Sequence, residues 1–373
     1  MRYKSWCKSI VLAAGLIIGG LFTVLYVVDP IGMFGSPLIS GVNNYKEKQA
    51  AFLDVYKPFE LRRYKPDDIY IGNSRVYVGW KTEENAYNLG MSSLSLPDMR
   101  AYLHWAYGNH VPQRVYIGLD LFQFSKSSME GNREGFSKER LDKLGKGGLY
   151  VFDEMLSVSM GMREYIRPTL AASRAHRNDK PIFIRGFSTL RGERTDINVK
   201  EYYHYLHSFY KTYSEWEYAP EAVNCLQAIL QEAEANGVEV YLFFNPVSVD
   251  LLALQDICEV EDDYREIKKQ VARIHPVYDF AWTNDMTMDG EQYWLDGSHY
   301  HCTVGEMMKQ SMNAGMNENI CKLLSGDNVN TVLSDEAVSY DAWRKSHLDY
   351  RETLKQLAPK EIETGQLQVY LGF

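Results

Sequence analysis

The longest apolar segment of the chain lies near its N-terminus. The uncharged run SIVLAAGLIIGGLFTVLYVV, residues 9–28, follows three basic residues: Arg2, Lys4 and Lys8. A helix needs about 20 apolar residues to cross a bilayer. A cleaved signal peptide has a shorter apolar stretch and small residues at its cleavage site, whereas this run ends in bulky residues. We therefore expect residues 9–28 to form an uncleaved transmembrane anchor.

The charges that flank the anchor set its orientation. Basic flanks stay on the cytoplasmic side, so residues 1–8 are expected to form a cytoplasmic stub. The chain after the anchor then lies outside the cytoplasm, in the periplasm or at the cell surface. The anticipated localisation is the cytoplasmic membrane, with a single span and an extracytoplasmic C-terminal domain.

Beyond the anchor, strand patterns alternate with helical patterns. Helices are expected after Pro97 and over residues 221–237, where Asn236-Gly237 is a typical helix end. Short apolar or β-branched runs predict strands at 68–71, 86–89, 114–124, 238–246 and 277–280. Strands alternating with helices are typical of a mainly parallel sheet covered on both faces. The fold class is therefore α/β, a three-layer α/β/α domain of flavodoxin-like type.

Three segments interrupt this alternation. Residues 29–60 contain Gly, Pro and Ser and are interpreted as a linker and lead-in. The main domain then spans 61–326 and holds a long, polar, Tyr-rich, partly helical insertion at about 125–219. Residues 327–373 form a peripheral C-terminal extension, with an amphipathic helix pattern over 341–357.

Composition narrows the possible partners. The chain has 373 residues, of which 24% are charged, and a formal net charge of -9. An acidic balance without a Lys/Arg-rich run argues against a nucleic-acid partner. The chain also has no glycine-rich nucleotide motif and no His/Cys metal cluster, so neither a cofactor nor a metal is expected.

The candidate chemistry begins where the first strand ends, in Gly72-Asn73-Ser74-Arg75. Gly, Asn and Ser are common in turns for backbone reasons alone. A nucleophilic serine, however, needs a base within hydrogen-bond reach and a group that orients this base. Asp296 and His299 have the spacing for that pair, with His301 close by as an alternative base and Asp296 also suited to a helix N-cap.

Four short pieces fall at or just beyond predicted strand ends: the Ser74 turn, Gly90 after the second strand, Asp120 within the third, and the Asp296–His299 segment. In doubly wound sheets, sites form where loops leave the carboxyl ends of the strands. The sequence therefore predicts that Ser74, His299 and Asp296 meet as nucleophile, base and orienting carboxylate.

In these blocks the sequence resembles the SGNH (GDSL-like) hydrolase superfamily. It is most similar to membrane-anchored members that serve cell-surface acylation, such as alginate O-acetylation and D-alanyl transfer proteins. The resemblance covers residues 68–124 and 222–312 and includes VYDFAWTNDMTMDGEQYWLDGSHYHCTVG. It implies an SGNH-type sheet, catalytic roles for Ser74, His299 and Asp296, and an oxyanion-binding backbone donor at Gly90.

One position departs from this pattern. The family's third block usually supplies an Asn amide to the oxyanion, where this chain has Asp120. An ionised carboxylate cannot donate a hydrogen bond. Either Asp120 is protonated by burial, or it points away and pairs with a cation such as Arg75, which is the reading we favour. Asn73 is then a candidate substitute donor.

The resemblance implies a membrane-anchored serine esterase or O-acyltransferase. Its substrates would be acyl esters, most simply acetyl esters, of a cell-surface polysaccharide, and a membrane-bound acyl-donor protein is the implied partner. The alternative is a non-catalytic polysaccharide-binding or scaffold subunit of a surface-polymer modification complex. The Asp120 departure favours this alternative, and the paired Ser and Asp-x-x-His blocks oppose it.

Overall fold

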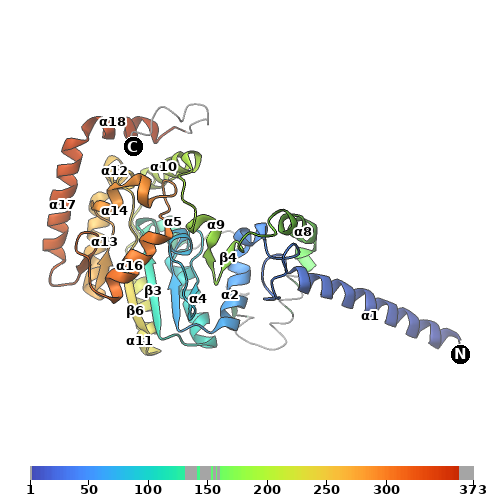
Figure 1. Cartoon of the computed structure of the whole chain (residues 1–373). Helices are drawn as coiled ribbons and strands as arrows, with labels where there is room; N and C mark the ends of the chain where they lie inside the picture. Colours follow the sequence, from blue (N-terminus) through green and yellow to red (C-terminus); the bar gives the residue numbers. More distant parts are fainter. Residues whose placement is uncertain (1, 131–140, 143–152, 154–156, 158–159, 361–373) are drawn as a thin grey trace. The chain divides into compact units, whose positions relative to one another are not determined.

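The computed structural model describes residues 2–130, 141, 142, 153, 157 and 160–360 (Figure 1). The chain divides into two compact units, Met1–Tyr64 with Ser137–Phe183, and Lys65–Phe136 with Ile184–Phe373. The expected insertion at 125–219 is therefore shared between both units. Parts of this insertion and the end of the C-terminal extension, 361–373, lie outside the described residues.

The first unit contains the apolar N-terminal helix. Among the described residues one helical segment, Tyr3–Val28, is long and apolar enough to cross a membrane by length and composition. The segment expected to be a linker is partly helical and partly buried, and the Asn43 side chain donates to the carbonyls of Val27 and Pro37. The elements of this unit are α1 (Arg2–Val28), η1 (Glu47–Phe52), α2 (Leu53–Tyr64), η3 (Met162–Tyr165) and α8 (Ile166–Ala175).

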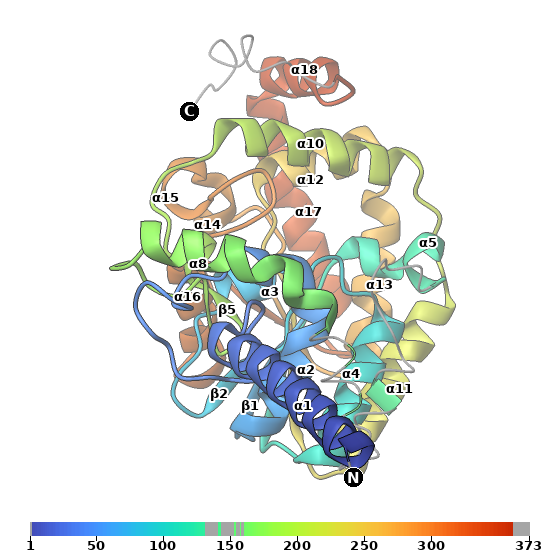
Figure 2. The same cartoon turned by 90° about the vertical axis from the view of Figure 1, so that its right-hand side faces the viewer.

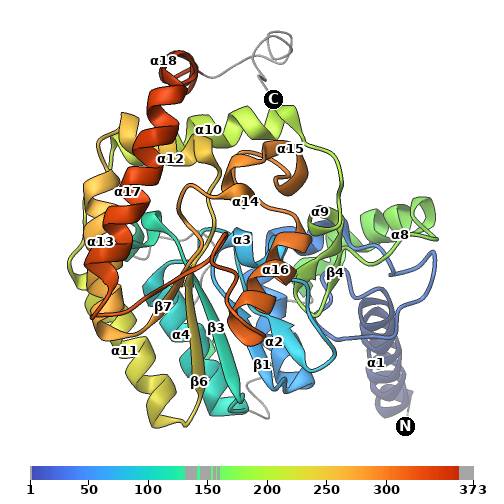
Figure 3. The same ribbon diagram turned by 60° about the vertical axis from the view of Figure 1, so that its left-hand side comes forward.

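The second unit is built on a six-stranded sheet (Figure 3). Five strands are parallel and the edge strand β8 is antiparallel to its neighbour. The α/β class and the mainly parallel sheet are thus confirmed. The sheet order is β2-β1-β3-β6-β7-β8, with bounds β1 Asp68–Ile71, β2 Ala86–Asn88, β3 Arg114–Leu119, β6 Glu239–Phe244, β7 Val277–Asp279 and β8 Lys322–Leu324.

The central strands are apolar along their length because helices cover them. In β3, every residue after Arg114 is buried, which is typical of a parallel strand packed on both faces. Aromatic rings fill the core beside these strands, and Trp80 stacks on Phe243 with ring centroids 4.6 Å apart. This packing anchors the strand ends from which the site residues emerge.

Helices connect and cover the strands. Helix α10 packs on α12 across the end of the sheet at which β1 leads into α3 (Figures 2 and 3). The main helices of this unit are α3 (Ser74–Gly79), α4 (Leu96–Asn109), α10 (Val199–Ser214), α11 (Glu221–Ala235), α12 (Val249–Ile257), α13 (Glu261–Ile274), α16 (Cys302–Asn313), α17 (Val329–Ser346) and α18 (Leu348–Leu357). Shorter elements are η2 (Leu121–Phe124), α5 (Lys126–Met129), β4 (Phe183–Ile184), β5 (Phe187–Ser188), α9 (Thr189–Gly192), α14 (Asp285–Met288) and α15 (Gly290–Tyr293).

Two elements differ from the sequence prediction. The third strand ends at Leu119, and residues 121–124 turn into the short helix η2, which Asp120 precedes. The single amphipathic helix pattern at 341–357 spans two helices, α17 and α18, which meet at His347. His347, at the junction, stacks on Trp343 one helical turn earlier, with ring centroids 4.9 Å apart.

Candidate active site

Ser74 stands at the first position of α3, directly after β1. The turn is tight because a Cβ on Gly72 would come within 2.9 Å of the Gly118 carbonyl on the neighbouring strand. Asn73 caps the helix, since its Oδ1 accepts the Arg75 N–H at 2.9 Å. These backbone requirements explain the Gly and Asn, and they place the Ser74 hydroxyl at the carboxyl edge of the sheet.

A short, braced loop carries the other two residues of the triad. The Leu295 N–H donates to the His299 carbonyl at 2.8 Å, and an isolated antiparallel bridge joins Trp294 to Tyr300. Inside the loop, Asp296 Oδ1 accepts the backbone N–H groups of Ser298 and His299, both at 2.8 Å. Hydrogen bonds across the base of the loop and inside it therefore fix Asp296 and His299 relative to each other.

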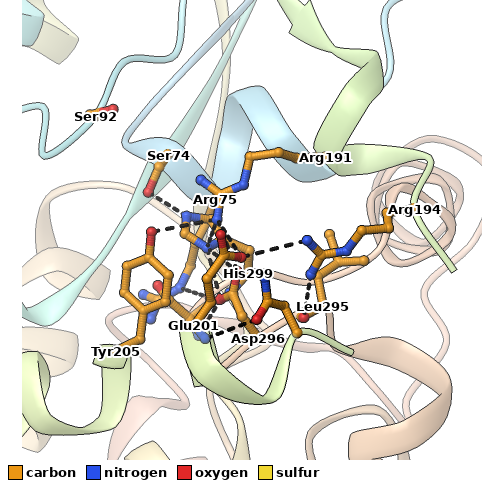
Figure 4. Close-up of polar contacts among 12 residues, drawn as sticks. Ser74, Arg75, Ser92, Arg191, Arg194, Glu201, Tyr205, Leu295, Asp296 and His299 are labelled. Atoms are coloured by element: carbon orange, nitrogen blue, oxygen red, sulfur yellow. Dashed lines mark hydrogen bonds and ion pairs between the residues drawn. The ribbon is translucent and has the colours of Figure 1, made fainter. Parts of the chain in front are cut away.

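The three predicted residues form a continuous hydrogen-bonded chain (Figure 4). His299 Nε2 lies 2.8 Å from Ser74 Oγ, and His299 Nδ1 lies 2.9 Å from Asp296 Oδ1. A carboxylate only accepts, so Nδ1 carries the proton and Nε2 is free to accept one from Ser74. His301 stands at the N-cap position of α16 without a capping side-chain hydrogen bond, and it is His299, not His301, that bonds Ser74. The structure thus brings Ser74 to His299 and not to His301.

Burial and charge set the ionisation of this chain. Burial lowers the pKa of His299 below its ordinary value, although Asp296 opposes the shift. Burial alone would raise the pKa of Asp296, but the His299 and Arg191 charges and hydrogen bonds outweigh it and hold that pKa low. A neutral imidazole beside an ionised carboxylate is the state that a general base requires at neutral pH.

Arg191 is a site residue that sequence reasoning missed. It belongs to α9, within the predicted insertion, and its Nη2 donates to Asp296 Oδ2 at 2.9 Å (Figure 4). The same nitrogen lies 3.3 Å from His299 Nδ1 and 3.4 Å from the Tyr205 hydroxyl. The insertion therefore supplies a cation to the carboxylate end of the triad. Nothing in the local sequence, TLRG, distinguishes this arginine from other surface arginines.

Asp120 pairs with Arg75, the arrangement favoured from the sequence. Arg75 Nη1 binds Asp120 Oδ1, and Arg75 Nε donates to the Ser298 carbonyl at 2.8 Å. Asp120 Oδ2 also accepts the side-chain amides of Asn73 and Asn245. Burial raises the pKa of Asp120, whereas Arg75 and both amides favour the ionised form. Because each of these partners is a donor, Asp120 acts as an acceptor that joins Asn73 and Arg75, at the start of α3, to Asn245 after β6.

The two predicted oxyanion donors are engaged elsewhere. The Asn73 amide donates to Asp120, and the Gly90 N–H donates to Asn88 Oδ1 at 3.0 Å. Asn88 in turn donates to the carbonyls of Val76 and Trp80, at 2.9 and 2.8 Å, and so fastens the end of α3. Gly90, Asn73 and Asp120 therefore surround the Ser74 turn, and the hydrogen bonds described for them stabilise it.

A cavity of about 360 Å³ opens beside Ser74. It runs from Ser74 and Ser298 toward α5 and α10, and three aromatic rings line it: Phe122, Tyr205 and Phe209. The Tyr205 ring also meets His299 edge to face, with centroids 5.0 Å apart. Small-molecule sites are typically about 300–1,000 Å³, so a ligand has room to reach the nucleophile.

In the part of the chain that the structure describes, no group of three or more His, Cys, Asp or Glu residues could hold a metal ion. No protein-family model matches the chain, and no curated protein matches it significantly. The geometry of the site itself is therefore the basis for a functional proposal.

Proposed function

We propose that the protein is a membrane-anchored, extracytoplasmic serine esterase or O-acyltransferase of SGNH type that acts on acyl esters, most simply acetyl esters, of a cell-surface polysaccharide. One observation carries the proposal: the unbroken chain from Ser74 Oγ through His299 to Asp296. Such a chain is the recurring arrangement of nucleophilic serine catalysis on unrelated folds. A surface turn would have no need of a buried imidazole and carboxylate aligned behind its hydroxyl.

The sheet order supports the SGNH-type part of the proposal. When the five parallel strands of this sheet are numbered in chain order, their order across the sheet is 2-1-3-4-5, which is the flavodoxin-like doubly wound order. In such sheets ligands bind beyond the carboxyl ends of the strands. Ser74 follows β1, Asp120 follows β3 and Asn245 follows β6, so the site lies at that edge.

The reaction would proceed in two balanced steps. As the Ser74 oxygen bonds to the acyl carbon, its proton passes to His299 Nε2, and the departing alcohol leaves with that proton. A second hydroxyl, from water or a sugar, then gives its proton to His299 Nε2 as its oxygen bonds to the acyl carbon. The bond from that carbon to the Ser74 oxygen breaks, and His299 returns the proton to Ser74. Water makes the protein an esterase, and a sugar hydroxyl makes it a transferase.

The N-terminal anchor is the basis for the proposed localisation of the protein. With its basic flank inside, helix α1 would hold the catalytic unit beside the outer face of the membrane, near an acyl-donor protein and a polymer that is being exported. A reporter active only in the cytoplasm, fused after Phe373, should be silent. An active fusion would overturn the assigned compartment.

The direct test of the activity is covalent labelling. The full chain in detergent, mixed with p-nitrophenyl acetate, should gain one acetyl group on Ser74, located by peptide mass spectrometry. Ser74→Ala should not be labelled. Ser92→Ala is the matched control, because Ser92 is exposed and its hydroxyl lies 3.1 Å from the Tyr77 hydroxyl and not beside a histidine among the described contacts. Equal labelling of Ser74→Ala, or no labelling of the parent, would refute the proposal.

A non-catalytic binding subunit is the second candidate function. The observation in its favour is that Asn73, Gly90 and Asp120 direct their polar groups to one another and to their neighbours. Removing one oxyanion donor from an acyl-transfer enzyme costs about 10²–10³ in kcat. A protein of this class would bind its polymer in the cavity and leave Ser74 unlabelled.

A further inference from the structure

The cavity beside Ser74 has an unusual lining. Of its fourteen lining residues, eight are Ser and one is Thr. Ser93, Ser127 and Ser208 are exposed at its rim, and Ser298 lies near the triad. A hydroxyl both donates and accepts hydrogen bonds, so this lining is complementary to a ligand that itself carries many hydroxyl groups.

Aromatic rings add apolar faces to the same cavity. Phe122, Tyr205 and Phe209 are each half-buried, so part of every ring remains available to a ligand. The Arg75 guanidinium makes a cation–π contact with Phe209, with Cζ 5.2 Å from the ring centroid. Rigid aromatic surfaces between hydroxyls suit a sugar ring, which presents C–H groups on its faces and hydroxyls at its edge.

Cations are missing from the lining. Among the described residues that line the cavity there is no Lys, Arg or His, and the single acidic side chain is the buried Asp98. Two nearby buried or half-buried cations are paired with carboxylates, Arg75 with Asp120 and Arg191 with Asp296, and the exposed Lys126 pairs with Glu217. A polymer of uronates or phosphodiesters would therefore bring its charge into the cavity without a cation among the described lining residues, which costs free energy.

We propose that this cavity is the acceptor subsite and that it takes an uncharged polyhydroxylated acceptor, a neutral sugar unit, in preference to a uronate or phosphodiester polymer. The inference rests on the proposed acyl transfer and narrows its substrate. The hydroxyl that receives the acyl group would enter between Tyr205 and Ser74, where His299 Nε2 accepts its proton.

Binding to the full-length Ser74→Ala chain in detergent tests this preference without turnover. The probes are hexasaccharides of glucose, mannose, galactose and N-acetylglucosamine, with C6-oxidised uronate forms of the first three, titrated by calorimetry. We expect at least one neutral hexasaccharide to bind saturably and every uronate to bind at least about tenfold more weakly, a difference of about 1.4 kcal/mol. A uronate that binds as tightly as its neutral form, or no binding of any neutral probe, would overturn the inference.

A charge placed on the cavity rim sharpens the test. Ser208→Lys, an exposed position on α10, should strengthen uronate binding about tenfold, since an added cation then faces the anion. Ser334→Lys is the control, because it adds the same charge at an exposed position on α17 that does not line the cavity. Equal effects of the two variants would contradict the assignment of the cavity.

The proposed function and this inference can fail separately. If p-nitrophenyl acetate does not label Ser74, the acyl-transfer proposal fails whatever the sugars do. If Ser74 is labelled but neutral and uronate acceptors shorten the lifetime of the acyl group equally, only the inference about the acceptor fails.

Discussion

The polar groups on the two sides of the turn Gly72–Arg75, which carries Ser74, are arranged differently. On one side, Ser74, His299 and Asp296 form a linear hydrogen-bonded chain whose terminal hydroxyl faces a cavity. On the other side, Asn73 and Asp120 bond each other, and further neighbours occupy their remaining polar atoms. The first arrangement leaves a proton free to move, whereas the second fixes the backbone that presents Ser74.

Arg75 connects the two sides. It follows Ser74 in the chain, pairs with Asp120 on one side, and holds the Ser298 carbonyl of the base loop on the other. The Asp120 carboxylate therefore has a structural use that is compatible with catalysis, because it binds the Arg75 side chain that in turn holds the base loop.

Removal of the nucleophile or the base should have the largest effect. Ser74→Ala and His299→Ala should each lower ester turnover by about 10⁴-fold or more, and the double variant should add little, because triad members act as a unit. Asp296→Asn should retain more activity than either. Steady-state rates of p-nitrophenyl acetate hydrolysis measure this effect. A Ser74→Ala variant that kept the parental rate would show that Ser74 is not the nucleophile.

Asp120→Asn should act on stability more than on rate. It leaves the buried Arg75 cation without its counter-charge, and breaking a buried pair costs about 3–5 kcal/mol. A denaturant titration of the unfolding free energy checks this. Glu193→Gln is the control, since its pair with the exposed Lys81 should contribute less than about 1 kcal/mol. If Asp120→Asn were faster than the parent and equally stable, catalysis would require a neutral hydrogen-bond donor at this position.

Arg191→Gln should weaken the carboxylate end of the triad. The loss of one charge-assisted hydrogen bond, about 1.5 kcal/mol, predicts a rate about tenfold lower. Because the Arg191 charge lowers the pKa of His299, its removal should also move the acid limb of the pH–rate profile to higher pH.

Arg194→Gln provides the comparison for that shift. Arg194 donates to the Leu295 carbonyl, at 2.8 Å, and not to a triad side chain. Its variant should leave the acid limb where the parent has it. An identical shift in both variants would show that Arg191 acts through the loop and not on His299.

Asn73 variants should have the smallest effect. If its amide only caps α3 and binds Asp120, Asn73→Ala should cost about 1 kcal/mol of stability. Asn73→Ser, which keeps a capping oxygen, should recover most of this, with turnover within about threefold of the parent in both variants. A loss of 100-fold or so in turnover at unchanged stability would identify Asn73 as an oxyanion donor.

Local patterns predicted the five parallel strands and the grouping of Ser74, His299 and Asp296, because the responsible signals are short. The strand end before Ser74 and the three-residue spacing of Asp296 and His299 are visible in the sequence, whereas the edge strand β8 and the end of β3 at Leu119 were not predicted. Arg191 and Asn88 were not predictable, because each acts by a contact across the fold that no local spacing records. The pairing of Asp120 with Arg75 was one of two options, and only the position of β3 beside β1 distinguishes them.

The pH dependence of Ser74 labelling by a fluorophosphonate is a direct test of the Ser74–His299–Asp296 assignment, because it reports an activated hydroxyl and its base together. Neutral His299 is required, and burial lowers the pKa of His299 below the ordinary value of about 6.5. We expect a single label on Ser74, a rate already at its plateau at pH 7, a decline only as pH falls below about 6.5, and loss of the label in His299→Gln. An unlabelled Ser74, or a labelling rate in His299→Gln equal to that of the parent, would contradict it.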